Sequence, residues 1–128
     1  MSFNVVIPAR LNSSRLKEKV LIEINDVPMV IHVAKRASLS GAKQIIVATD
    51  DKKVADIVKL HNFQSVMTDK NHLSGTDRCL EVAKIMKWNN SEIIVNVQAD
   101  EPLIDPKLIS LLASNVEKDK SGYVTACS

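Results

Sequence analysis

The basic side chains most suited to binding a polyphosphate fall in one polar segment, residues 8–19. Arg10, Arg15, Lys17 and Lys19 are spread along it, and two serines lie among them. Guanidinium forks and ammonium groups on a loop are what the oxygens of a polyphosphate need. From charge alone, a solvated loop explains the same residues equally well. The segment directly follows a predicted strand, which favours phosphate binding.

A second candidate site follows a buried apolar run, in the segment VQADEP at residues 97–102. Asp100 comes just after the predicted strand, and magnesium commonly uses one or two protein carboxylates while sharing its other positions with water and substrate phosphates. Asp100 is therefore the predicted magnesium ligand. Glu101 is more simply explained as an exposed loop acid.

The third candidate is the segment HLSGTDR at residues 72–78, which precedes a predicted helix. Free backbone N–H groups and the positive end of the helix dipole at Ser74, Gly75 and Thr76 could receive an anion or the polar edge of a base. A serine or threonine N-cap explains the same residues without a ligand. His72 alone is more typical of a surface or capping histidine than of a catalyst.

Composition and absent motifs exclude several classes. The chain has 128 residues, 17 basic and 15 acidic side chains and a net charge of +2, which argues against a nucleic-acid binder. No GxxxxGK[ST], GxGxxG, CxxC or HExxH motif occurs, which excludes the common ATPase, dinucleotide and zinc-hydrolase interpretations. No signal peptide or membrane helix is expected, and Cys79 and Cys127 are interpreted as reduced, so we expect a cytoplasmic protein.

Strand and helix patterns alternate along the whole chain, which predicts an α/β fold. Because strands alternate with helices, we expect right-handed crossovers and a mainly parallel sheet between two helical layers, a three-layer Rossmann-like arrangement. Ligands then bind in loops beyond the carboxyl ends of the strands. Strands are predicted at 3–7, 20–24, 44–50, 65–68, 92–97 and 123–126, and helices from Pro28 to before Gly41, after Asp50 or Asp51, at 77–87 and from Pro106 to about Glu117.

The three loops together resemble the cytidylyltransferases that activate acidic sugars. The resemblance begins with VIPAR at 6–10, followed by Ser14, Arg15 and Lys19. His72, SGTDR at 74–78 and NVQ-x-DEP at 96–102 make the combination similar to the CMP-Kdo synthetases, which act on 3-deoxy-manno-octulosonate (Kdo). The match covers nearly the whole chain in order and spacing.

The resemblance implies that CTP and Kdo give CMP-Kdo and pyrophosphate with Mg2+, on the way to lipopolysaccharide. It implies a glycosyltransferase-A-type fold, a homodimer at full length and a nucleotide-binding part over 1–128 without an internal linker. The implied roles are as follows: Arg10, Arg15 and Lys19 hold the triphosphate; Ala9, Ser74, Gly75, Thr76, Arg78 and Gln98 frame cytosine and ribose; Asp100 is a magnesium ligand.

Three departures from the family pattern keep alternatives open. Lys17 and Glu18 stand where the family has proline and glycine, and Ala99 stands where glycine is usual. The chain ends at Ser128, about where the resemblance places the second half, with the sugar pocket and a second metal carboxylate. One alternative is a truncated or degenerate homologue that binds nucleotide without turnover. The other is an enzyme for another acidic sugar such as sialic acid, against which the SGTDR run counts.

Overall fold

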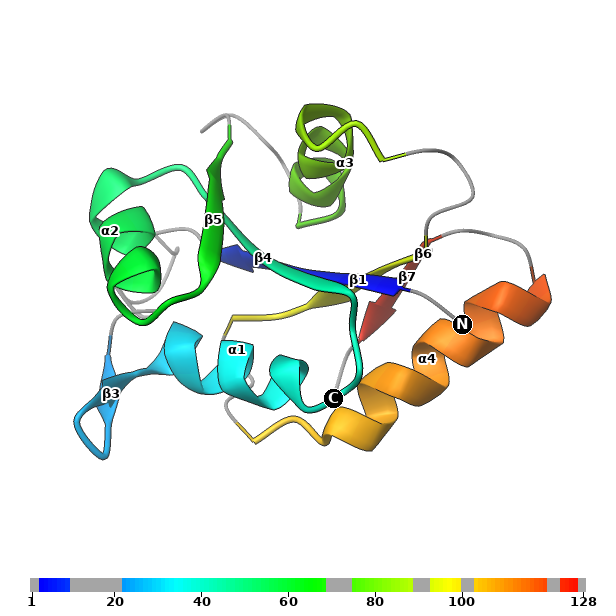
Figure 1. The fold of residues 1–128 in the computed structure, drawn as a ribbon, viewed down its shortest axis with the longest axis horizontal. Helices are drawn as coiled ribbons and strands as arrows, with labels where there is room; N and C mark the ends of the chain where they lie inside the picture. Colours follow the sequence, from blue (N-terminus) through cyan, green and yellow to red (C-terminus); the bar gives the residue numbers. More distant parts are fainter. Residues whose placement is uncertain are drawn as a thin grey trace.

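A parallel sheet forms the centre of the protein. The computed structural model describes residues 3–9, 22–68, 75–88, 93–99, 103–119 and 123–126. Five strands lie in the order β5-β4-β1-β6-β7, and every neighbouring pair is parallel (Figure 1). The sheet strands are β1 (Phe3–Ala9), β4 (Gln44–Thr49), β5 (Gln64–Met67), β6 (Ile93–Val97) and β7 (Tyr123–Ala126).

Helices cover both faces of the sheet, as Figure 1 shows. One face carries α1 (Met29–Ser38), α2 (Lys52–Leu60) and α4 (Pro106–Asp119), and the other carries α3 (Gly75–Ile85). Alternate residues of β1 divide between the two cores: Val5 and Ile7 pack in the larger cluster, whereas Val6 packs against α3. The period of two in a strand explains this division. The predicted three-layer α/β fold is confirmed.

One crossover, from β6 through α4 to β7, differs in handedness from the others, although the same hand was expected for all. From β1 to β4 to β5 the chain moves one way across the sheet with its helices on the α1 face, and it returns to β6 with α3 on the opposite face. These three crossovers therefore share one hand. From β6 to β7 the chain continues in the return direction, yet α4 packs on the α1 face, so this crossover has the opposite hand. Ile109 and Ala113 of α4 are fully buried in the α1-side core, and that burial determines the side on which the helix lies.

A small hairpin follows the first loop, where the sequence predicted only one strand. Strands β2 (Glu23–Ile24) and β3 (Val27–Pro28) pair antiparallel around Asn25 and Asp26. Both turn residues have positive φ, 53° and 65°, the backbone of a tight I′-type hairpin turn in which Asn and Asp are well tolerated. The turn pair was predicted, but the returning strand was not. Pro28 ends that strand and is the N-cap of α1, so the helix begins one residue later than predicted.

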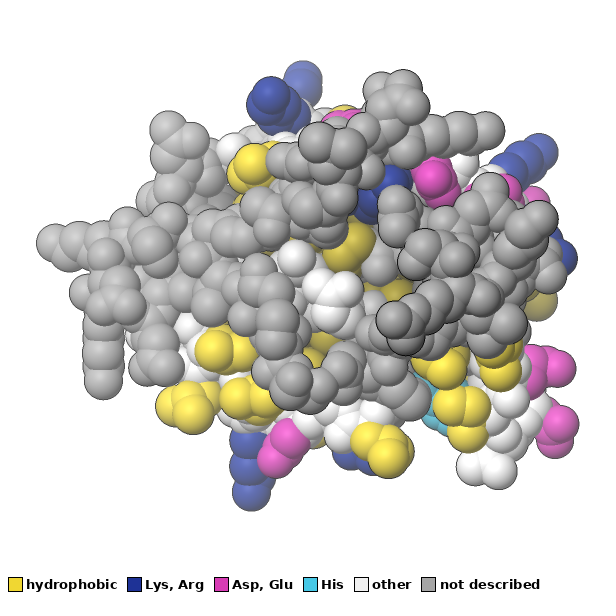
Figure 2. Space-filling view, turned by 180° about the vertical axis from the view of Figure 1, so that it is seen from behind, with side chains coloured by type: hydrophobic (Ala, Val, Ile, Leu, Met, Phe, Trp, Pro, Cys, Tyr) yellow, Lys and Arg dark blue, Asp and Glu magenta, His cyan; other side chains and the backbone are white. Residues whose placement is uncertain are grey.

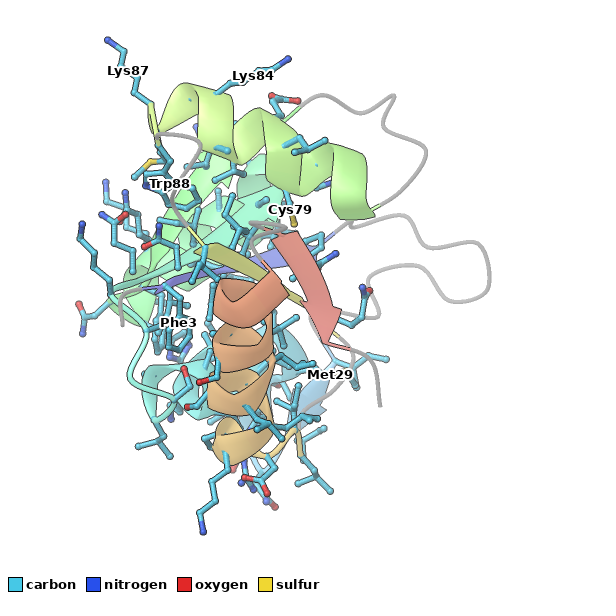
Figure 3. The ribbon with its side chains drawn as sticks, turned by 90° about the vertical axis from the view of Figure 1, so that its right-hand side faces the viewer. Phe3, Met29, Cys79, Lys84, Lys87 and Trp88 are labelled. Carbon is cyan, nitrogen blue, oxygen red and sulfur yellow. The ribbon has the colours of Figure 1, made fainter. Side chains whose placement is uncertain are left out.

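The residues facing the sheet from α3 also differ from the sequence expectation. A helix was predicted at 77–87, where Leu80, Ala83 and Met86 recur at three-residue spacing, but α3 spans Gly75–Ile85 and Leu80 is 48% exposed. Cys79 and Val82 are fully buried instead, with Ala83 and Met86 packed beside them. In Figure 3, Cys79 lies on the sheet side of α3, whereas Lys84 and Lys87 project away from it.

Large apolar side chains also remain at the surface, among them Leu60, Leu103 and Leu111. In the view from behind, apolar side chains occur in groups along the lower rim, interspersed with charged ones (Figure 2). Single exposed apolar residues are normal on soluble domains and define no site by themselves.

Candidate functional site

All five parallel strands point the same way, so the residues that follow them meet at one edge of the sheet. The strand order reverses next to β1, which has β4 on one side and β6 on the other. Crevices at such a reversal are where open α/β sheets bind ligands. Ala9 ends β1 and is fully buried, and Gln98 follows β6 with a partly buried side chain. The structure therefore brings these two predicted nucleotide-binding residues to neighbouring strand ends.

Several predicted residues lie outside the described part of the chain. Arg10, Arg15 and Lys19, the predicted triphosphate ligands, are among them, as are Ser74 and Asp100, the predicted magnesium ligand. Arg10 comes directly after β1, Ser74 directly before α3, and Asp100 directly after the buried Ala99.

The SGTDR segment enters α3 directly. Gly75 and Thr76 are the first two residues of that helix, so their backbone N–H groups belong to the set that an α-helix leaves without a partner inside the helix. The helix dipole makes this end partly positive. These two predicted site residues therefore lie at a helix N-terminus. The helix begins two residues earlier than the sequence pattern indicated.

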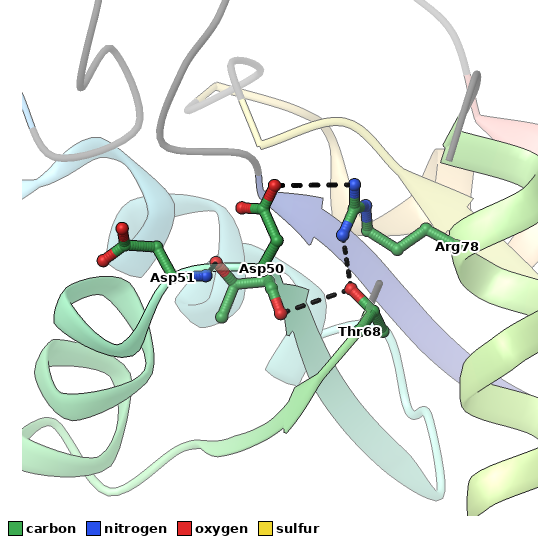
Figure 4. Close-up of polar contacts among 5 residues, drawn as sticks. Asp50, Asp51, Thr68 and Arg78 are labelled. Carbon is green, nitrogen blue, oxygen red and sulfur yellow. Dashed lines mark hydrogen bonds and ion pairs between the residues drawn. The ribbon is translucent and has the colours of Figure 1, made fainter. Parts of the chain in front are cut away.

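Arg78 lies in the same first turn, and its surroundings are protein. Its side chain is 1% exposed and is the largest of the fully buried ones among the described residues. Nη1 donates a hydrogen bond to Thr68 Oγ1, and Nη2 lies 3.9 Å from Asp50 Oδ2 (Figure 4). Among the described residues, Nη2 has no hydrogen-bond partner of its own. The guanidinium is therefore held at the carboxyl edge of the sheet, between residues that follow β4 and β5.

Threonines connect this arginine to the ends of two strands. The Thr68 hydroxyl donates a hydrogen bond to the carbonyl of Thr49 at 3.2 Å, and the Thr68 backbone N–H donates to the same carbonyl at 2.8 Å. The Oγ1 of Thr49 accepts from the backbone of Asp51, whose carboxylate in turn caps α2 by accepting from Lys53 N at 2.7 Å. A continuous set of polar contacts thus joins α3, β5, β4 and the start of α2 (Figure 4).

Asp50 and Thr68 were not predicted as site residues. Asp50 was expected only as the last residue of a strand and a possible cap of the next helix, and the cap is Asp51. One signal was available, because Asp50 and Thr68 are the last residues of the predicted strands 44–50 and 65–68, and the ends of parallel strands gather at one edge of the sheet. Nothing in their spacing from Arg78 along the chain indicates the contact.

A family model described as cytidylyltransferase matches residues 4–128 of this chain. The chain belongs to the cytidylyltransferase family. Curated members of the family agree with this assignment. A 3-deoxy-manno-octulosonate cytidylyltransferase of Psychromonas ingrahamii is 48% identical over 129 aligned residues, and one of Methylibium petroleiphilum is 49% identical over 113.

Those alignments cover 100% and 88% of this chain but 51% and 43% of the relatives. The chain therefore spans about half the length of the curated cytidylyltransferases that it matches.

Solved structures of cytidylyltransferases have the same fold. A structure described as CMP:2-keto-3-deoxy-manno-octonic acid synthetase complexed with CTP superposes with a TM-score of 0.85 at 38% identity, over 94% of this chain and 49% of that one. A cytidylyltransferase of Leptospira borgpetersenii gives a TM-score of 0.79 at 26% identity, over 94% and 51%. A nucleotidyl transferase of Methanothermobacter thermautotroptrophicus, at 19% identity, a TM-score of 0.72 and coverage of 88% and 57%, shares the fold.

Two further findings concern the described residues only. None of their helices is long and apolar enough to cross a membrane. Within the same ranges, no three histidine, cysteine, aspartate or glutamate side chains gather as a metal site. Cys79 is buried, and Cys127 lies outside the described ranges.

Proposed function

We propose that this chain is the nucleotide-binding part of a cytidylyltransferase that activates Kdo with CTP. The products are CMP-Kdo and pyrophosphate, and residues 1–128 form the part that binds CTP. One observation carries the proposal: the whole chain aligns at 48% identity with a relative named for this substrate. The names of these relatives favour Kdo over sialic acid as the sugar.

The geometry of the sheet edge supports a nucleotide site. The predicted contacts belong to the start of α3 and to segments that follow β1 and β6, two strands that are neighbours at the reversal of the strand order. In this proposal Ala9, Gly75, Thr76 and Gln98 lie against cytosine and ribose, together with Ser74. Arg10, Arg15 and Lys19 hold the triphosphate.

The reaction needs positioning and charge neutralisation more than a protein base. The anomeric hydroxyl of the sugar attacks the α-phosphorus of CTP in line. A bond forms between that oxygen and phosphorus, the bond from the α-phosphorus to its bridging oxygen breaks, and pyrophosphate leaves with the electron pair. Arginine and lysine side chains oppose the charge that spreads over the leaving group, as in other phosphoryl transfers.

The proposal includes a magnesium ion held by Asp100, a carboxylate that follows the buried strand β6 along the chain. The chemistry of the donor fits a hard cation that shares its remaining positions with phosphates and water. The ion would neutralise phosphate charge and orient the triphosphate. A cytoplasmic location and a homodimer of the full-length protein complete the proposal, both on the strength of the resemblance.

Calorimetric titration of the chain with CTP and Mg2+, with ATP as the competing nucleotide, tests the function. We expect CTP-selective binding that requires the metal. Asp100→Ala should abolish the metal dependence, because the only carboxylate proposed as a ligand is lost. Asp56→Ala is the matched control, since this aspartate is exposed on α2 and away from the sheet edge.

Two results would contradict the proposal. Failure of the folded wild-type chain to bind CTP would remove the function assigned to these residues. Unchanged magnesium-dependent binding by Asp100→Ala would leave the nucleotide site standing but refute the metal assignment.

A further inference from the structure

Arg78 is an unusual residue to find inside the protein. A guanidinium remains protonated at any physiological pH and presents five N–H donors, so its burial is unfavourable unless charges and acceptors surround it. At 1% exposure, Arg78 has almost no surface through which a ligand could approach. Among the described residues, its polar side-chain partners are Thr68 and Asp50.

These contacts join the start of α3 to the ends of β4 and β5. Along the backbone, residues 69–74 are the connection between β5 and α3. Arg78 belongs to the first turn of α3, Thr68 follows β5, and Asp50 follows β4. Thr68 is itself tied to the end of β4 by two bonds to the Thr49 carbonyl. The position of this first turn relative to the sheet edge therefore depends on the arginine.

We infer that Arg78 is a positioning residue for the nucleotide site. Together with Thr68 and Asp50, Arg78 holds the first turn of α3 against the carboxyl edge of the sheet. The inference rests on the proposed function for what that turn contacts. It revises the role that the family resemblance implied for Arg78, because the guanidinium serves the protein and not the nucleotide. Gly75 and Thr76, in the same first turn of α3, are the residues that it positions.

Among the three side chains, the hydroxyl of Thr68 can be removed with the least change in side-chain shape. Thr68→Val deletes the acceptor of the Arg78 bond, and Thr68→Ser keeps it. We expect Thr68→Val to weaken CTP binding about ten-fold, the effect of losing one hydrogen bond to a charged group. Thr68→Ser should bind CTP as the wild type does, and Lys84→Met, on the exposed side of the same helix, should as well.

A double-variant comparison separates positioning from direct contact. If Arg78 acts through Thr68, then Arg78→Lys combined with Thr68→Val should bind CTP no more weakly than the worse single variant. If Arg78 contacts the nucleotide itself, Thr68→Val should leave binding unchanged while Arg78→Lys reduces it, or the two losses should multiply. Either of these outcomes would overturn the inference.

Amide hydrogen exchange without ligand keeps the inference testable apart from the proposed function. We expect Thr68→Val to speed exchange at Cys79 and Leu80, in the turn that Arg78 holds, while Met86, which donates to the Val82 carbonyl at 2.8 Å, stays as in the wild type. Unaltered exchange at Cys79 and Leu80 would refute positioning even if CTP binds. If the wild-type chain fails to bind CTP, the proposed function fails, and the exchange result alone decides whether Arg78 holds the turn.

Discussion

Replacing either partner of the Asp50–Arg78 pair should destabilise the protein by different amounts. Asp50→Asn leaves a guanidinium that is 1% exposed and permanently charged without its carboxylate. Arg78→Met leaves a carboxylate that is 16% exposed and that water can still reach. Because an unpaired buried charge is costly in proportion to its isolation from water, Asp50→Asn should be the more harmful change.

The separation between the two charged groups sets the magnitude of the expected loss in the free energy of unfolding. Two unit charges 4 Å apart interact by about 4 kcal/mol at an effective dielectric constant of 20, which is an upper bound for this pair at 3.9 Å. Partial access of water to Asp50 lowers the figure, so we expect Asp50→Asn to reduce the free energy of unfolding by about 2 to 3 kcal/mol. Arg78→Met loses a charged hydrogen bond but no longer has to bury a charge, so its net cost should be about 1 kcal/mol.

Urea denaturation measures both values, with far-UV circular dichroism and the fluorescence of Trp88 as probes. Trp88 is the single tryptophan, and its indole N–H donates to Gln44 Oε1 at 3.0 Å, so it reports on the packing of α3 against β4. Asp56→Asn, at an exposed position of α2, is the control and should change stability by less than about 0.5 kcal/mol. A larger loss for Arg78→Met than for Asp50→Asn would refute the reasoning, because it would mean that Asp50 does not compensate the buried guanidinium.

Two further changes test how the elements around the site are held. Asp51→Ala removes the side chain that accepts from Lys53 N at the start of α2 and should cost about 1 kcal/mol, seen as a lower melting temperature; a change within error would mean that water replaces the cap. Ile109→Ala should cost about 2 to 5 kcal/mol in urea denaturation, because this fully buried side chain packs α4 into the α1-side core; a loss below 1 kcal/mol would argue against the observed packing of α4.

The local pattern of the sequence was enough to predict the layers and the edge where the site lies. Runs rich in apolar and β-branched residues, such as 3–7 and 93–97, predict buried strands, because a strand covered on both faces is apolar at nearly every position. The capping of α4 was equally local. Asp105 precedes Pro106, and its carboxylate accepts from Lys107 N at 2.9 Å.

The role of Arg78 could not be predicted in this way. The three-residue spacing of Leu80, Ala83 and Met86 gave no sign that Arg78 would be buried, and the nucleotide-binding role of Arg78 came only from the family resemblance. The tertiary structure places Arg78, Cys79 and Val82 on the sheet side and exposes Leu80. The burial of Arg78 depends on two partners, Thr68 and Asp50, which come together only when β4 and β5 pair and Arg78 reaches them from the first turn of α3.

The amino-acid sequence thus determined the alternation of strands and helices, and with it the parallel sheet and the edge that gathers the loops. The tertiary structure decided which charged side chain the protein uses for itself and on which face α4 lies. The physical reason is the same in both cases. Periodicity and capping act over a few neighbouring residues, whereas the burial of a charge or of a helix depends on partners that only the assembled sheet brings within contact.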